Sequence, residues 1–109
     1  MATPVTLDLS ELGRFSEPAL LILVSLAPGA KHGYAIMEDI KAMTGAEMRA
    51  GTLYAALNRL ERHGLIAPLP SDDRRKPYRL TTEGAAALRA QLTNLSSFAA
   101  MGLRRLAAT

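Results

Sequence analysis

The chain has 109 residues, of which 49% are hydrophobic and 21% charged, and its formal net charge is +3 at pH 7. This is the composition of an ordinary globular protein with room for one modest core. Cysteine is absent, which excludes disulfides and thiolate metal sites, and the two histidines lie far apart in the sequence. No signal peptide is visible, and the longest apolar run, residues 19–27, is too short to span a bilayer. We therefore expect a cytoplasmic protein with no metal, cofactor or membrane segment.

The positive charge is concentrated in the second half of the chain. Residues 1–46 carry three basic and five acidic side chains, whereas residues 47–80 carry seven basic and four acidic ones. A local basic patch of this kind favours a polyanionic partner. The alternative is a charged face that contacts only solvent, which would give the same numbers of basic and acidic side chains.

Residues 1–16 are expected to form an N-terminal arm that contains a short amphipathic segment. We expect this arm to pack on a neighbouring element. Glu17-Pro18 is typical of a helix start, because proline is tolerated in the first turn and an acid suits the positive end of the helix dipole. The helix expected at residues 18–27 is apolar nearly all round and therefore central to the core. A second helix is expected from Tyr34 to Thr44, with its buried side formed by Tyr34, Ile36, Met37, Ile40 and Met43.

Residues 51–63 are the stretch around which the other elements are organised. Leu53, Leu57 and Leu60 recur at helical spacing and predict one apolar stripe. The opposite face is small and polar at its start and basic further along: Thr52, Ala55, Ala56 and Arg59, with Tyr54, Asn58 and Arg62 on its flank. Such a helix fits a DNA major groove, and together with the preceding short helix it predicts a helix-turn-helix. Gly64 can end it in the left-handed conformation.

Two short strand candidates, residues 65–69 and 78–81, enclose a polar loop of residues 70–77 with the adjacent cations Arg74, Arg75 and Lys76. Apolar strands around a basic loop predict a hairpin, the wing of a winged helix-turn-helix. Pro68 cannot donate to a strand ladder, so its strand must be short or lie at an edge. A run of cations is usually only a solvated loop, but its position directly after a candidate recognition helix favours contact with nucleic acid.

A final helix is predicted after Thr81, which can cap it, with Glu83 in the first turn. Apolar and small residues recur along this helix at alternating steps of four and three, a pattern typical of a coiled-coil seam. The seam and its flanking aromatic residue are Leu88, Leu92, Leu95, Phe98, Ala99, Gly102 and Leu106. We expect this stripe to form a dimer interface, because so small a domain has little left to cover it. The alternative is that the helix folds back on its own core.

Three separated motifs follow one another in the chain. They are His32-Gly33-Tyr34-Ala35-Ile36, the stretch from Gly51-Thr52-Leu53-Tyr54 to Gly64-Leu65-Ile66, and Tyr78-Arg79-Leu80-Thr81 with Gly84. In this order they resemble the PadR-like family of transcriptional regulators, over roughly residues 20–88. The resemblance implies a winged helix-turn-helix, a homodimer held by N- and C-terminal helices, and operator binding, usually as a repressor. The single C-terminal helix is similar to that of the short subfamily.

Two features depart from the family pattern. Arg49 and Ala50 stand where the family commonly has a capping serine and a proline, so the recognition helix lacks its usual cap. There is no tryptophan, so the stacked-aromatic drug pocket of some short members, and with it a small-molecule effector, has no support here.

The sequence thus predicts a mainly α fold with a small β-hairpin, divided into an arm (1–16), a winged helix-turn-helix domain (17–81) and a dimerisation helix (82–109). We expect a homodimer that binds double-stranded DNA at a roughly palindromic operator, with half-sites about one turn apart. The candidate DNA contacts are Tyr34, Arg49, Thr52, Tyr54, Asn58, Arg59, Arg62, Arg74, Arg75 and Lys76. Sequence alone does not sort them into base and phosphate contacts.

The sequence supports two other classes of function less well. A winged-helix module could use the same face for a protein partner, but acidic or apolar residues would then be expected where Arg59 and Arg62 stand. An enzyme is not supported, because no paired carboxylates, nucleophile–base set, phosphate loop or metal-ligand spacing is present.

Overall fold

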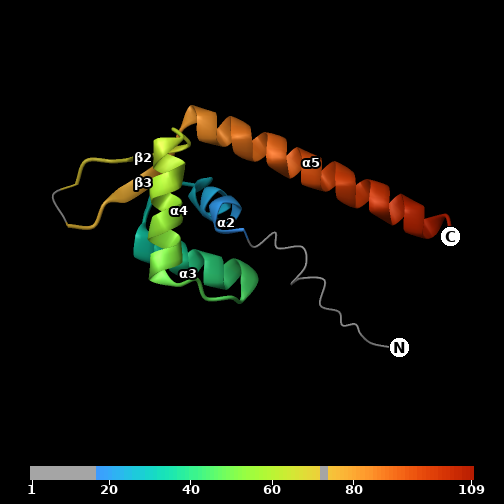
Figure 1. Cartoon of the computed structure of the whole chain (residues 1–109), viewed down its shortest axis with the longest axis horizontal. Coiled ribbons are helices and arrows are strands. Elements are labelled where there is room, and N and C mark those ends of the chain that lie inside the picture. The colour runs from blue at the N-terminus through green and yellow to red at the C-terminus, as the bar shows by residue number, and fades with distance from the viewer. Residues whose placement is uncertain (1–16, 72–73) are drawn as a thin grey trace.

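The structure is a computed structural model that describes residues 17–71 and 74–109, so the predicted arm of residues 1–16 lies outside the described residues. The elements in chain order are α2 (Pro18–Leu26), β1 (Lys31–His32), α3 (Gly33–Thr44), α4 (Ala50–Arg62), β2 (Ile66–Pro68), β3 (Pro77–Leu80) and α5 (Thr82–Ala107). Figure 1 shows α2, α3 and α4 gathered beside the small sheet, with α5 leaving this body as a long arm. The predicted fold class, a winged helix-turn-helix with a long C-terminal helix, is confirmed.

Helix α2 lies at the centre of the core. It packs against α3, α4, α5 and β3, which explains why it is apolar on nearly every side. The largest fully buried apolar side chains come from α2, α3, α4 and β2: Ile22, Leu26, Ile36, Ile40, Leu53, Leu57 and Ile66. The core is therefore formed mainly within the winged domain, with Leu88 added by α5, and it fixes the angle at which α4 is presented.

One polar network lies at the edge of this core. Ser25 is almost fully buried, and its hydroxyl donates a hydrogen bond to Asp39 Oδ2 at 2.7 Å. Lys31 Nζ lies 3.8 Å from the same carboxylate oxygen and donates to the Ser25 carbonyl. Buried polar groups of this kind are tolerated because they are paired, and here the pairing joins α2, β1 and α3.

The expected buried side of α3 is wrong at two positions. Tyr34 is 60% exposed, because it lies two residues before Ile36 and successive residues are about 100° apart around a helix. Met43 is also exposed, since it lies in the last turn and all of residues 41–47 are open to solvent. Gly45 ends the helix with a φ of 78°, as the Thr44-Gly45 pair predicted.

The sheet has three antiparallel strands in the order β1-β3-β2. The β2–β3 hairpin is the predicted wing, with Ile66 opposite Leu80 and Pro68 opposite Tyr78. Pro68 is the last residue of a three-residue edge strand, which confirms the prediction that its strand is short or lies at an edge. Strand β1 was not predicted; its two residues pair with Tyr78 and Pro77 on the other side of β3.

Helix α5 starts as predicted. The Gly84 amide donates to Thr81 Oγ1 at 2.9 Å, and the Thr81 hydroxyl donates to the Gly64 carbonyl at 2.7 Å. Gly64 itself has a φ of 75° and ends α4, as expected. A side chain at Gly84 would overlap the Leu65 carbonyl, so glycine lets α5 lie directly against the connection between α4 and β2. In the described part of the chain, none of the helices is both long and apolar enough to cross a membrane.

Candidate nucleic-acid interface

Helix α4 turns one face to the core and the other to solvent. Leu53, Leu57 and Leu60 are buried, as their spacing predicted. Ala56 was assigned to the exposed face, and this is wrong, since it is only 2% exposed. It lies three residues after Leu53 and four before Leu60, and therefore at the edge of the buried stripe.

The outer face of α4 carries cations that are available to a ligand. Thr52, Asn58, Arg59 and Arg62 are all exposed, and so is Arg49 at the N-cap position. Within residues 17–71 and 74–109, the ion pairs found are Lys31–Asp39 and Lys41–Glu47, so none of these arginines is held by an acid there. An uncommitted guanidinium offers several donors to a phosphate or a guanine edge.

The start of α4 lacks a side-chain cap, as the departure from the family pattern implied. Arg49 has the extended backbone of an N-cap residue, with φ −71° and ψ 147°, but its side chain makes no capping hydrogen bond. The first-turn amides of α4 therefore have no side-chain partner from this position. Amides of this kind, at the positive end of a helix dipole, favour an anion.

The wing places a second group of cations beside α4. Arg74, Arg75 and Lys76 are exposed, as predicted for residues in the loop of a hairpin. Lys76 Nζ lies 5.7 Å from the centre of the Tyr78 ring, and Tyr78 is buried in the sheet. This cation–π contact ties the base of the loop to the fold.

Arg79 is a further exposed cation of the wing that was not among the predicted site residues. It is exposed on β3, between the buried Tyr78 and the half-buried Leu80. Because side chains alternate between the two faces of a strand, a buried Tyr78 places Arg79 on the opposite side of the wing. That alternation was the signal from which the exposure of Arg79 could have been predicted.

The structure brings together only part of the predicted site. Tyr34, Tyr54 and the three wing cations line one pocket of about 310 Å³, formed by the start of α3, the first half of α4 and the wing. Arg49 and Thr52 line a different hollow, beside α2 and the connection between α3 and α4. Asn58, Arg59 and Arg62 lie further along the open face of α4 and line neither pocket.

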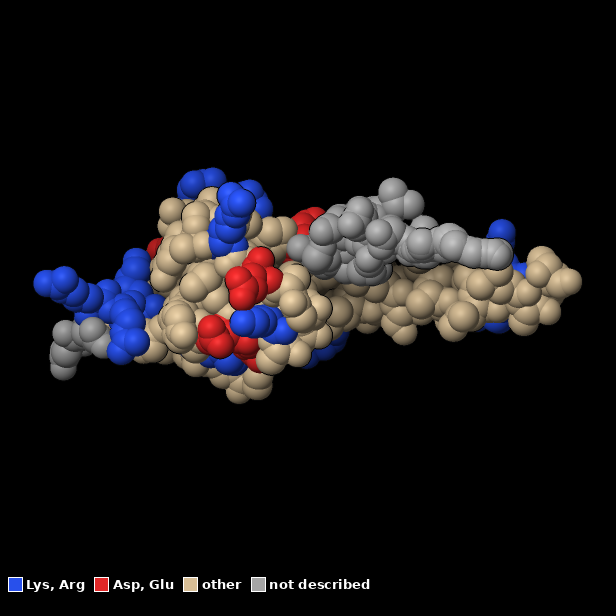
Figure 2. Space-filling view, turned by 90° about the horizontal axis from the view of Figure 1, so that it is seen from below, with Lys and Arg blue, Asp and Glu red and all other residues tan. Residues whose placement is uncertain are grey.

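Most of the basic side chains on this face lie apart from the acidic ones. In Figure 2, Lys and Arg side chains gather at the wing end and along one edge of the body, while Asp and Glu gather nearer its middle. One acidic group belongs to the connection between α3 and α4, where Glu47 and Lys41 pair at 3.0 Å. The hydrogen bond to the Glu47 carboxylate, with its negative charge, raises the pKa of Lys41 above its ordinary value. Lys41 is thus paired with an acid, unlike the arginines of α4.

Comparison with known proteins shows the family of the chain. Residues 22–90 match the sequence model of the transcriptional regulator PadR-like family, which is more than half of the chain. The chain belongs to the PadR-like family. The resemblance seen in the three motifs and the winged helix-turn-helix fold are thereby confirmed. PadR-like proteins regulate transcription and are not enzymes, so the absence of catalytic groupings in the sequence fits the family.

Individual proteins are also similar to the chain. The chain is 41% identical over 71 residues to an uncharacterised 37.1 kDa protein in transposon Tn4556 of Streptomyces fradiae, but spans only 21% of that protein's length. It is similar to the crystal structure of a PadR family transcription regulator from Clostridium difficile, with a TM-score of 0.74, 26% identity, and coverage of 82% of this chain and 97% of that one. For the RosR protein of H. salinarum the TM-score is 0.68 and the identity 32%, with 79% of each chain covered.

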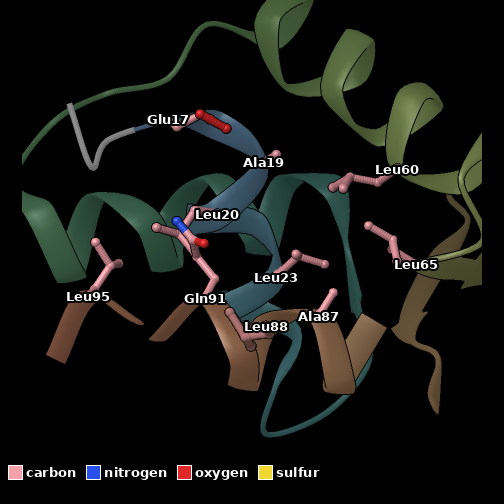
Figure 3. A pocket seen from close by; sticks show the side chains of 10 residues that line it. All are labelled: Glu17, Ala19, Leu20, Leu23, Leu60, Leu65, Ala87, Leu88, Gln91 and Leu95. Carbon is pink, nitrogen blue, oxygen red and sulfur yellow. The ribbon is translucent and has the colours of Figure 1, made fainter. Parts of the chain in front are cut away.

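In this PadR-like chain, the seam of α5 divides into a buried and an exposed part. Leu88 is buried in its own core and Leu95 is half-buried, whereas Phe98 is 70% and Leu106 71% exposed. Figure 3 shows Leu88 and Leu95 beside an apolar pocket of about 510 Å³, with walls from α2, the end of α4, Leu65 and α5. The alternative of a helix that folds back on its own core therefore holds for Leu88. The C-terminal half of the seam has no such cover among the described residues.

Proposed function

We propose that this PadR-like protein is a homodimeric repressor that reads a roughly palindromic operator. The observation that carries this proposal is the uncommitted, exposed arginine set of α4, which lies beside a cationic wing on the same domain. In this mode of binding, α4 enters the major groove, and Arg59, Arg62 and Asn58 meet base edges or nearby phosphates. The wing cations reach the adjacent minor groove or its phosphates.

Two copies are required for a palindromic operator. The exposed seam of α5 supplies a surface on which a second copy can pair, and its small residues Ala99 and Gly102 suit a close approach of two helices. Two α4 helices held in this way meet successive major grooves, about one helical turn apart. Residues 17–81 then act as the DNA-binding unit and residues 82–109 as the dimerisation unit, and the protein works in the cytoplasm with the chromosome.

The test is binding to a labelled duplex, measured by fluorescence anisotropy at several salt concentrations. A duplex selected by the wild-type protein from a random pool is compared with a scrambled one. Tight binding that prefers the selected duplex and weakens steeply with salt is expected, because phosphate contacts release counterions. Equal binding to both duplexes would show DNA binding without an operator.

Variants separate the two parts of the interface. Arg59→Ala is expected to lose about 1–3 kcal/mol of binding free energy to the selected duplex if Arg59 reads a base. Simultaneous replacement of Arg74, Arg75 and Lys76 by alanine is expected to weaken binding to every duplex and to lower the salt slope by roughly 2–3. Lys41→Ala, a cation that pairs with Glu47, is the control and should bind as the wild type does.

Unchanged affinity in both variants, with intact circular dichroism, would remove DNA binding from this face. If the wild-type protein bound no duplex even at low salt, a winged-helix module for a protein partner would take the place of this proposal.

A further inference from the structure

The pocket between the wing and the first turn of α3 has a chemistry of its own. It measures about 310 Å³, and six of its lining residues are Gly33, Tyr34, Tyr54, Arg74, Lys76 and Tyr78. We call these six residues the wing notch. Its lining residues provide hydroxyl and cationic groups, and none of those that the structure describes is a carboxylate. An opening with this lining is suited to an anion with several acceptor oxygens.

The floor of the wing notch is the start of a twelve-residue helix. α3 begins at Gly33, and the preceding N-cap residue, His32, makes no side-chain capping hydrogen bond. His32 also lines the pocket, and its Nδ1 atom is buried without a hydrogen-bond partner in the described part of the chain. The uncapped amides of the first turn of α3 thus add partial positive charge to a site that already has cations on its wing side.

Tyr54 is held against this helix start by the absence of a side chain at Gly33. A Cβ atom built on Gly33 would lie 2.5 Å from Tyr54 Oη and 2.9 Å from Tyr54 Cζ. The phenol therefore fills the space that any larger residue would occupy, and its hydroxyl is placed beside the first turn of α3. Because Tyr54 belongs to α4, the same side chain connects the wing notch to the proposed recognition helix.

We propose that the wing notch binds one backbone phosphate of DNA and that Gly33 is the residue that positions Tyr54 for it. This inference rests on the proposed function, and it adds a discrete phosphate site whose contacts do not depend on the base sequence. DNA is favoured over a free phosphorylated ligand because the notch is open between the wing and α4, the two elements proposed to face DNA. The hydroxyls of Tyr34 and Tyr54 donate to the phosphate oxygens, and Arg74 and Lys76 supply charge.

The test uses two variants of the 109-residue chain, one that removes the hydroxyl of Tyr54 and one that moves it. Tyr54→Phe keeps the ring and removes only the hydroxyl. Gly33→Ala keeps the hydroxyl but moves it, because the phenol end of a tyrosine can shift when a methyl group enters its space. Gly29→Ala is the matched control, since a Cβ there meets nothing within 4 Å.

On the duplex selected by the wild-type protein, Tyr54→Phe and Gly33→Ala are each expected to weaken binding roughly tenfold, as for the loss of one hydrogen bond to a charged group. The scrambled duplex should weaken by a similar factor, because a phosphate contact carries no base information. Gly29→Ala should match the wild type. All three should retain the wild-type circular dichroism spectrum.

A phosphate-by-phosphate scan locates the contact. Single phosphates of the selected duplex are replaced in turn by uncharged methylphosphonates. One replacement that weakens the wild-type protein should have much less effect on Tyr54→Phe, because the partner hydroxyl is already missing. A purely structural role of Tyr54 would leave every replacement equally costly in both proteins.

The outcomes separate the two proposals. If the wild-type protein binds DNA and both variants bind equally well, the wing notch is overturned and the proposed function stands. If the wild-type protein binds no duplex, the proposed function fails, and the notch is judged by titration with inorganic phosphate and ATP. In this titration, NMR chemical-shift changes of the Gly33 and Tyr34 amides that disappear in Tyr54→Phe would assign the site to a free phosphorylated ligand. If these amides show no change, the site is overturned as well.

Discussion

Ala55 and Ala56 are neighbours on α4 with opposite surroundings. Ala55 is exposed, whereas Ala56 is 2% exposed and belongs to the core. We expect Ala56→Leu to lower the free energy of unfolding by about 1–3 kcal/mol, because added methylene groups have no free space in a packed core. Ala55→Leu, the same change one position away, should alter it by less than about 0.5 kcal/mol. Urea unfolding followed by circular dichroism measures both, and equal stabilities would contradict the burial of Ala56.

The same pair shows what sequence reasoning can resolve at the level of single residues. Leucines at helical spacing gave the correct buried stripe of α4, because a large apolar side chain has a strong preference for the core. Alanine has no such preference, so its side of the helix depends on where the stripe is drawn. The prediction that Tyr34 is buried was wrong for a related reason. A tyrosine can pack its ring or expose it, and only the position of α3 against α2 decides between the two.

At the level of elements, α4 begins without the cap that its family commonly has. Arg49 already has the backbone of an N-cap residue. Arg49→Ser is therefore expected to raise the free energy of unfolding by about 1 kcal/mol, because a serine oxygen can accept from a first-turn amide. The same variant should bind DNA less tightly if Arg49 meets a phosphate.

Thermal unfolding and duplex anisotropy on Arg49→Ser give the two readouts. Higher stability with weaker binding is the expected pair of results. Arg104→Ser, a replacement of the same kind near the end of α5, should neither raise the stability nor weaken DNA binding. A variant with higher stability and unchanged affinity would take Arg49 out of the proposed interface.

Elements were predicted where their signals are local. The recognition helix was placed at 51–63 and runs from Ala50 to Arg62, and the cap at Thr81 was found in place. Strand β1 could not be found in this way, because two residues cannot show alternation and its partner, β3, lies more than forty residues later. The residues of the wing notch were not placed together for the same reason, because the start of α3, the first half of α4 and the wing meet only after folding. Sequence reasoning could name Tyr34, Tyr54 and Lys76 but could not place them together.

On the scale of the whole molecule, α5 is too long for the domain that it leaves. Its 26 residues span about 39 Å, and the molecule extends 58 Å along its longest axis. Figure 1 shows that only the first part of this helix lies beside the body. Beyond Leu95, all residues of α5 are exposed, including the apolar Phe98 and Leu106. An exposed apolar stripe of this extent is typical of an interface between proteins, and the seam pattern favours a second copy of the same helix.

Ala99 gives a direct test of this pairing, because it lies in the seam and is exposed in the single chain. Ala99→Glu is expected to separate the dimer, since a glutamate would have to be buried unpaired between two helices. Sedimentation equilibrium should then report one chain of 11.7 kDa in place of two. Ser97→Glu, which adds the same charge on the side of the helix away from the seam, should remain dimeric. A dimeric Ala99→Glu beside a monomeric Ser97→Glu would place the interface on the opposite face of α5.

The loss of the dimer should also appear in DNA binding. Each winged domain keeps its own contacts, so Ala99→Glu should bind a duplex with a single half-site about as well as the wild type does. On a duplex with two half-sites, the wild-type dimer gains from two linked contacts, a gain on the order of 10²–10⁴ in affinity that the monomer lacks. Affinities of the two proteins that differ only on the two-site duplex would show that α5 acts by holding two recognition helices at a fixed spacing. Equal losses on both duplexes would show instead that the charge at Ala99 disturbs the winged domain itself.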